Sequence, residues 1–222
     1  MSNRRIIIVD DHPLFRAALR QTLAGEGSQY SIAEAGDLEG LAAALEADRD
    51  CDLVLLDLNM PGVRGFSGLL LLRAQYPDVP VMIVSAVEDA TVVRRAFELG
   101  ASGYLQKSVG PAEIRAAIET VLAGGVAAPE GVELTQSDDQ SELMRRLASL
   151  TPQQVRVLMM LSDGLMNKQI AYELSISEAT VKAHVSAILQ KLNVDSRTQA
   201  VIAAARIEEG QFEALLAGRE SA

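Results

Sequence analysis

The stretch Leu53-Val54-Leu55-Leu56-Asp57-Leu58-Asn59-Met60-Pro61-Gly62 ("LVLLDLNMPG") is the clearest structural signal in the first part of this chain. Its unbroken apolar run predicts a strand that is buried on both faces, and the Pro-Gly pair ends it. A carboxylate at the end of such a strand has to be paired, bound to a metal or neutralised, because a lone buried charge is unstable. The preceding strand, Ile6–Val9, leads in the same way into Asp10 and Asp11.

Strand patterns alternate with helix patterns from residue 1 to residue 122. The strands are continuously apolar, which predicts a parallel sheet with helices on both faces. The sequence therefore predicts an α/β fold, a flavodoxin-like doubly wound (βα)5 unit. The expected strands are 6–9, 30–34, 53–56, 81–84 and 103–106, and the expected helices lie at about 13–24, 38–47, 65–75, 89–99 and 111–123.

Polar residues follow the apolar strands at the edge where parallel sheets form their sites. They are Asp10, Asp11, Asp57, Ser85 and Lys107. Three neighbouring carboxylates need a cation, and a set of oxygen ligands suits a hard ion such as Mg²⁺. A carboxylate can also attack phosphorus to give an aspartyl phosphate, whose oxygens an ammonium and a hydroxyl would neutralise.

Asp10-Asp11, Asp57, Ser85-Ala86, Tyr104 and Lys107, in this order, resemble the receiver domain of two-component response regulators over residues 4–123. The segments "VDDHPLF" and "LLDLNMPG" are similar to the NarL/FixJ branch of that family. The resemblance implies that Asp57 accepts a phosphoryl group from a sensor histidine kinase. It implies that Mg²⁺ is held by Asp11, Asp57, the backbone carbonyl of Asn59 and, through water, Asp10. It also implies that Ser85 and Lys107 hold the phosphoryl group and that Tyr104 is the switch aromatic that follows Ser85.

The formal net charge of −10 is unevenly distributed along the chain. Residues 1–123 hold 17 acidic and 11 basic side chains, and residues 124–144 hold five acidic side chains and no basic one. Residues 145–207 hold eight basic and four acidic side chains, a net charge of +4. An acidic front followed by a basic block indicates an appended module that binds nucleic acid.

The segment "GGVAAPEGVELTQSDDQ" (124–140) combines Gly, Pro and acidic residues without periodicity, which is typical of linkers. The sequence predicts a flexible acidic linker over 124–144, with a helix that could start near Ser141. A helical DNA-binding domain is expected over 145–210.

Helix signals recur through this second domain. Thr151 and Pro152 begin one helix, and Ser196 and Gly210 bracket the last. Between them, the short "NKQIAYELS" and the long "SEATVKAHVSAILQKLNV" predict a helix-turn-helix, whose second helix enters the major groove of DNA. One face of the long helix is apolar and should pack inward; its residues are Val181, Val185, Ile188, Leu189 and Leu192.

The opposite face of the long helix carries small residues flanked by cations, which suits close approach to base edges. The segments "LTPQQ", "NKQIA", "TVKAHVSAILQKL" and "SRTQAV" resemble the LuxR/GerE-type DNA-binding domain over residues 148–210. The resemblance implies that the helix at 196–208 forms the dimer. It implies that Lys182, Ala183 and Ser186 face the groove, and that the DNA backbone is positioned by Asn167, Lys168, Thr180, His184 and Lys191.

The preferred interpretation is a transcription factor that binds double-stranded DNA as a homodimer when Asp57 is phosphorylated. An enzyme that uses Asp57 as a nucleophile on phosphate esters is the first alternative, but Asn59 stands where haloacid-dehalogenase-type phosphatases need a second acid. A constitutive DNA-binding protein is the second alternative. No apolar segment reaches the ~20 residues that span a bilayer and no signal-peptide pattern opens the chain, so a cytoplasmic protein without a membrane partner is expected.

Overall fold

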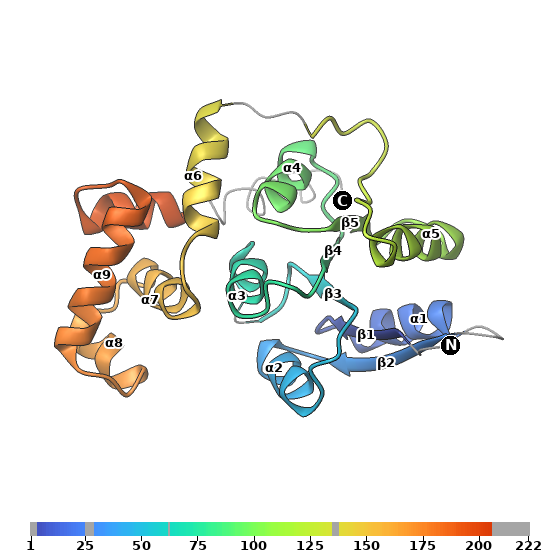
Figure 1. Ribbon diagram of the computed structural model, residues 1–222, viewed down its shortest axis with the longest axis horizontal. Coiled ribbons are helices and arrows are strands. Elements are labelled where there is room, and N and C mark those ends of the chain that lie inside the picture. The colour runs from blue at the N-terminus through green and yellow to red at the C-terminus, as the bar shows by residue number, and fades with distance from the viewer. Residues whose placement is uncertain (1–3, 25–28, 62, 135–137, 206–222) are drawn as a thin grey trace, which may run out of the picture.

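The computed structural model describes residues 4–24, 29–61, 63–134 and 138–205. Its first part is the α/β unit that the sequence predicts, with five strands and their helices in strict alternation (Figure 1). The strands are β1 (Arg4–Val9), β2 (Tyr30–Ala35), β3 (Leu53–Asp57), β4 (Val81–Ser85) and β5 (Gly103–Gln106). The helices are α1 (Pro13–Leu23), α2 (Leu38–Ala47), α3 (Ser67–Gln75), α4 (Ala90–Glu98) and α5 (Pro111–Leu122).

Short polar signals fix where these helices begin. Asp37 accepts a hydrogen bond from the Gly40 N–H at 2.7 Å, and Asp89 accepts one from the Thr91 N–H at 2.6 Å, so both carboxylates cap helix N-termini. Pro13 and Pro111 stand at the first position of their helices, where a missing N–H costs nothing.

The sheet is entirely parallel, in the order β2-β1-β3-β4-β5. Alternate strand residues point to opposite faces, so Ile6 and Ile8 pack with α1 and α5, whereas Ile7 and Val9 belong to the core beneath α2, α3 and α4. The strand order reverses between β1 and β3. A doubly wound sheet forms its site at the carboxyl ends next to such a point, and Asp10 and Asp57 both lie there.

The second part of the structure is all helical, as predicted. Thr151 makes a reciprocal capping box with Gln154, Ser177 caps the long helix through the Thr180 N–H, and Ser196 accepts a bond from the Gln199 N–H. The helices are α6 (Asp138–Ala148), α7 (Pro152–Ser162), α8 (Asn167–Glu173) and α9 (Glu178–Leu192), and residues 197–205 are also helical. The end of the helix expected at 196–208 lies outside the described residues.

The helical wheel proposed for α9 is confirmed. Val181, Ile188 and Leu192 are at most 2% exposed, and Val185 and Leu189 are half-buried against the same core. None of the helices in the described residues is both long and apolar enough to cross a membrane.

The connector differs from the irregular segment expected over 124–144. Ala127 pairs with the edge strand β5: the Tyr104 N–H donates to its carbonyl at 2.9 Å. Helix α6 begins at Asp138, three residues before the expected start at Ser141. The sequence lacks a strong helix signal there, and packing supplies the stabilisation, because Met144 and Leu147 are buried where α6 meets α3, α4 and α9.

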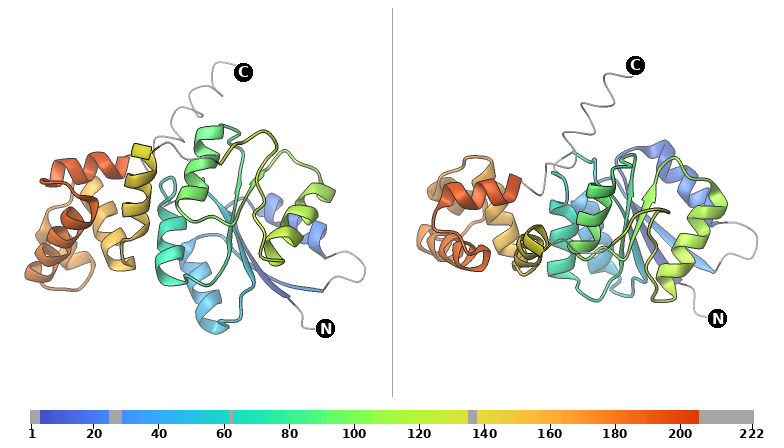
Figure 2. Two further views of the ribbon diagram at one scale, coloured as in Figure 1. Left: turned by 45° about the horizontal axis from the view of Figure 1, so that its top comes forward. Right: turned by 90° about the horizontal axis from the view of Figure 1, so that it is seen from above.

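The two parts of the chain pack against each other through α3 and α4 on one side and α6 and α7 on the other. The views in Figures 1 and 2 agree that the C-terminal helices form a lobe beside α3 and α4, with α8 and α9 farther from the sheet than α6 and α7. An ion pair joins Arg64, before α3, to Asp163, at the end of α7, at 2.5 Å. The arrangement leaves the outer face of α9 uncovered.

Candidate functional site

Three of the predicted site residues meet at the carboxyl edge of the sheet. Asp10 follows β1, Asp57 ends β3, and Lys107 follows β5. The Lys107 Nζ lies 2.6 Å from Asp10 Oδ2 and 2.9 Å from Asp57 Oδ2, so the ammonium bridges both carboxylates. The side chains of Asp10 and Asp57 are at most 2% exposed, and that of Lys107 is 18% exposed. Partial burial shields this bridge from water and from salt.

The remaining oxygens of the two buried carboxylates are bonded to the backbone. The His12 N–H donates to Asp10 Oδ1 at 2.7 Å, and the Asn59 N–H donates to Asp57 Oδ1 at 3.1 Å. Each acid is therefore oriented by the turn that follows its own strand. These bonds leave Asp57 held from two sides, which is the orientation that a fixed nucleophile requires.

Burial and charge pairing compete at this site. Burial raises the pKa of Asp57, and the hydrogen bond from Lys107 opposes that rise only in part. Burial alone would lower the pKa of Lys107, but its hydrogen bonds to Asp10 and Asp57 prevail and raise the pKa. The lysine therefore stays protonated in the neutral range, where it can neutralise anionic oxygens beside Asp57.

The surroundings of the Asp11 carboxylate show whether the acidic residues fit a metal ion. Its Oδ1 is buried and has no hydrogen-bond partner among the described residues, and it lies 2.8 Å from Nδ1 of His12. That contact is an ion pair only when the histidine is protonated, and the ring is 65% exposed. Ligand atoms of Asp10, Asp11, His12 and Asp57 all lie within 4.8 Å of one another. A carboxylate oxygen that has two other carboxylates within 4.8 Å fits a hard divalent cation.

Ser85 and Tyr104 are joined through one backbone residue. The Val87 N–H donates to Ser85 Oγ at 3.2 Å, and the Tyr104 hydroxyl donates to the Val87 carbonyl at 2.8 Å. Ser85 is fully buried at the end of β4, and Tyr104 is 2% exposed. Burial of the ring raises the pKa of Tyr104 to about 12. Val87 is therefore bonded to both side chains, through its N–H to Ser85 and through its carbonyl to Tyr104.

Arg16 is a supporting residue that the sequence patterns do not reveal. Its guanidinium donates to the backbone carbonyl of Asp10 and pairs with Glu34 at 3.5 Å. It ties the turn after β1 to the neighbouring strand β2. In the sequence, Arg16 is distinguished only by its position one turn into the first helix. Arginines are common on exposed helix surfaces, so this position alone does not indicate a supporting role. Asn59, in contrast, was predicted for its carbonyl, and its side chain is exposed.

The residues predicted to face the DNA groove lie together on the outer surface of α9. Lys182, Ala183 and Ser186 are all exposed, opposite the buried Val181 and Ile188. The Lys182 Nζ lies 3.1 Å from the Glu178 carboxylate one turn earlier. A DNA phosphate would compete with this carboxylate for the same ammonium.

The residues predicted to contact the DNA backbone have mixed surroundings. Lys168 is exposed, Thr180 belongs to the capping turn of α9, and His184 is half-buried. Asn167 accepts a hydrogen bond from Arg197 at 3.4 Å. Lys191 donates to the Ser149 carbonyl at 2.6 Å, which ties the end of α9 to the turn before α7. An ammonium has three N–H donors, so this bond to Ser149 is compatible with the predicted phosphate contact of Lys191.

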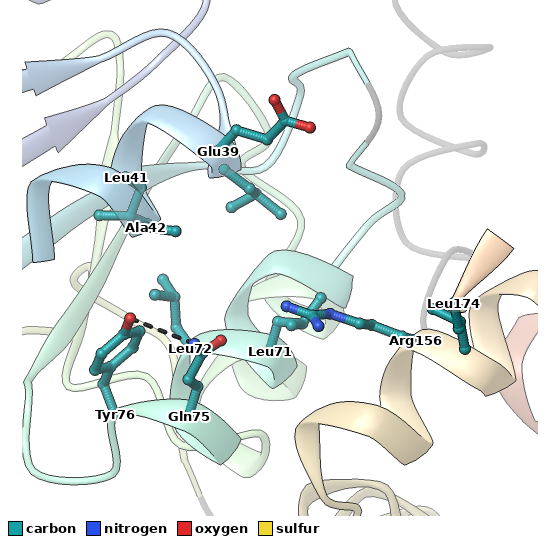
Figure 3. Close-up of a pocket in the computed structure, with 10 residues that line it drawn as sticks. Glu39, Leu41, Ala42, Leu71, Leu72, Gln75, Tyr76, Arg156 and Leu174 are labelled. Carbon is teal, nitrogen blue, oxygen red and sulfur yellow. Dashed lines mark hydrogen bonds between the residues drawn. The ribbon is translucent and has the colours of Figure 1, made fainter. Parts of the chain in front are cut away.

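A pocket of about 400 Å³ lies between the two parts of the chain, and no sequence pattern predicts it. Figure 3 shows its walls: α2 and α3 on one side, and Arg156 of α7 and Leu174 on the other, with Arg156 extending towards Leu71. The lining is mostly apolar. Glu39 and Arg156 are its charged side chains, and they do not form a catalytic cluster.

Comparison with known proteins follows the same division of the chain. The family "Response regulator receiver domain" matches residues 6–119, and "Bacterial regulatory proteins, luxR family" matches residues 148–204. The glycerol metabolism activator of Pseudomonas putida is 43% identical over 212 residues, which are 92% of this chain and 96% of that protein. The nitrate/nitrite response regulator protein NarP of Escherichia coli is 38% identical over 201 residues, 89% of this chain and 93% of that protein. A solved RcsB response regulator of Salmonella typhimurium superposes with a TM-score of 0.55 at 22% identity, covering 92% of this chain and 99% of that one.

Proposed function

Because this chain belongs to the response regulators that join a receiver domain to a LuxR-type DNA-binding domain, we propose that phosphorylation of Asp57 controls its binding to DNA. Transcriptional regulation is the function of the family. The observation that carries the assignment of Asp57 is its place: a fully buried carboxylate held by the Asn59 N–H and bridged by the Lys107 ammonium.

The phosphoryl donor in this proposal is the phosphohistidine of a sensor kinase. An Asp57 oxygen attacks phosphorus, the P–N bond to the imidazole breaks, and the imidazole leaves with its electron pair and takes a proton. The Lys107 ammonium, 2.9 Å from Asp57 Oδ2, is placed to neutralise the phosphoryl oxygens, and the Ser85 hydroxyl lies at the end of the adjoining strand β4. Preorganised charge, more than covalent chemistry, lowers the barrier to phosphoryl transfer.

Mg²⁺ is the proposed metal, held by Asp11, Asp57 and the Asn59 carbonyl, with Asp10 nearby. The clustering of carboxylate oxygens from Asp10, Asp11 and Asp57 within 4.8 Å supports this choice. The ion supplies positive charge that offsets the three carboxylates and the phosphoryl oxygens. His12 is left out of the set because Mg²⁺ prefers oxygen ligands.

We expect no steady turnover on phosphomonoesters. A phosphatase that works through an aspartyl phosphate needs a second acid to activate water, and Asn59 stands two residues after the nucleophile. Lys107 is a protonated cation and cannot replace that base. The aspartyl phosphate is then a stored signal.

DNA recognition is assigned to the outer face of α9, with Lys182, Ala183 and Ser186 towards the major groove. Lys168 and Thr180, both exposed, are the proposed contacts to the sugar-phosphate backbone. The arrangement of the two lobes bears on regulation. Because the receiver packs on α6 and α7 and the α9 face is exposed, phosphorylation has no covered recognition helix to release. We therefore favour control through a homodimer that places two α9 helices on two half-sites.

The proposal is tested by DNA titration with and without beryllofluoride, an acyl-phosphate mimic, using the wild type and Asp57→Asn. Beryllofluoride should raise the affinity of the wild type by roughly 5- to 150-fold, the usual range of allosteric coupling, and leave Asp57→Asn unchanged. Sedimentation of the same samples should show dimers only for the treated wild type. Equal affinities in all four samples would establish a constitutive DNA-binding protein instead.

A further inference from the structure

The ammonium of Lys107 has a third neighbour besides Asp10 and Asp57. Its Nζ lies 4.7 Å from the centroid of the Phe15 ring. An ammonium at this distance over an aromatic face is attracted by the negative potential of the ring, and the attraction grows when water is partly excluded. The Lys107 side chain is only 18% exposed, so this contact is largely shielded.

The position of Phe15 follows from the turn that carries the acids. Helix α1 begins at Pro13, directly after Asp10, Asp11 and His12, and the Phe15 N–H donates to the His12 carbonyl at 3.1 Å. Phe15 is half-buried against the core beneath α1 and α5. The ring is therefore fixed by the same first helical turn that follows the acidic residues. Lys107, in contrast, follows β5 and is distant from Phe15 in the sequence.

An aromatic ring has an advantage over a further carboxylate at this place. The site already holds Asp10, Asp11 and Asp57 and has to accept an anionic phosphoryl group. A fourth negative charge would stabilise the ammonium but would repel that group. The face of a neutral ring favours the cation without adding formal charge.

We propose that Phe15 is a positioning residue for Lys107. Its ring holds the ammonium beside Asp10 and Asp57, where the ammonium can bind the phosphoryl oxygens. The inference rests on the proposed function, since it concerns phosphoryl acceptance at Asp57. Phe15 itself touches the lysine and not the reacting atoms.

Fluorination of the ring separates its electrostatic role from its packing. Monofluoro-, difluoro- and trifluorophenylalanine at position 15 weaken the negative face step by step with little change in shape. In the full-length protein with Mg²⁺ and acetyl phosphate, the initial rate of Asp57 labelling should fall step by step, by about 3- to 10-fold at the trifluoro stage. Phe15→Leu should lose a similar factor, and Phe15→Tyr, which keeps the π face, should restore most of the rate.

Two controls make the series decisive. In a Lys107→Ala background the same fluorination should change nothing further, and Leu14→Ala, at an 88% exposed neighbour, should label at the wild-type rate. A labelling rate that stays flat across the fluorinated series, in protein with unchanged thermal unfolding, would overturn the inference and leave Phe15 as packing alone. Labelling of Asp57→Asn at the wild-type rate would instead overturn the proposed function, so the two failures are distinguishable.

Discussion

The backbone N–H of Tyr104 donates a hydrogen bond of 2.9 Å to the carbonyl of Ala127, and the Ala127 N–H in turn donates to Ser102 at 3.3 Å. The segment after α5 thus returns to the free edge of the sheet and adds a short parallel bridge beside β5. The Tyr104 hydroxyl is bonded to Val87, whose N–H is bonded to Ser85. The backbone of Tyr104 is bonded to Ala127 in the connector. Tyr104 therefore contacts both Val87 and the connector. The connector leads to α6 and the DNA-binding lobe.

This bridge predicts an effect of Ala127→Pro. Proline removes the N–H that bonds Ser102 and should loosen the connector from β5. We expect unchanged labelling of Asp57 but a loss of most of the beryllofluoride-induced gain in DNA affinity, itself roughly 5- to 150-fold. The matched control is Ala128→Pro, because within the described residues the Ala128 N–H makes no backbone hydrogen bond. Full coupling in Ala127→Pro would show that the bridge is not part of the signal.

Asp11→Asn should abolish Mg²⁺-dependent labelling by acetyl phosphate and leave the fold intact. The substitution removes a negative charge from the acidic edge, and the amide is a weaker ligand for a hard cation. Phosphate-affinity electrophoresis reports the label, and calorimetric titration with Mg²⁺ reports binding directly. Glu39→Gln, an exposed carboxylate on α2, is the charge-matched control. Normal labelling and Mg²⁺ binding by Asp11→Asn would refute the assignment.

Substitutions of Lys182 and of its ion-pair partner Glu178 should change DNA affinity in opposite directions. Lys182→Ala should weaken DNA binding and reduce the slope of log affinity against log salt by about 1, because one phosphate contact is lost. Glu178→Gln should strengthen DNA binding, because it removes the carboxylate that lies 3.1 Å from the Lys182 ammonium.

Ser186→Ala should alter the DNA sequence preference with little change in the salt slope. An unchanged affinity and slope in Lys182→Ala would contradict the docking of α9.

Tyr104 predicts how stability changes at high pH. In the folded protein the pKa of Tyr104 is about 12, above the ordinary value near 10. The buried, protonated hydroxyl therefore contributes stability that is fully present below pH about 10 and is lost as the pH rises to about 12. The free energy of unfolding should decline by up to about 1.4 kcal/mol per pH unit in that window. Urea unfolding of Tyr104→Phe should lack this component of the decline. Tyr172→Phe, at an 83% exposed position, should retain it; an equal decline in both variants would disprove the prediction.

The strands, the helix starts and the acidic residues at the edge of the sheet could all be predicted from the amino-acid sequence. Apolar runs, prolines and capping side chains act on residues within one turn or one strand, so their effect can be judged from neighbours in the chain. Asp10, Asp57 and Lys107 could be placed together because every strand of a parallel sheet ends at the same edge. The apolar face of α9 could be placed for the same reason, since its spacing is helical.

The contacts between distant segments depend on how the helices pack, and they could not be predicted from the amino-acid sequence. Leu14 and Phe15 are adjacent apolar residues in one helical pattern, yet Leu14 is 88% exposed and Phe15 lies under an ammonium 92 positions later in the chain. Lys191 donates to the carbonyl of Ser149, 42 positions earlier in the chain, and no helical pattern indicates that contact. Periodicity fixes which face of a helix is apolar, whereas the partner of each side chain depends on how the helices pack around the sheet.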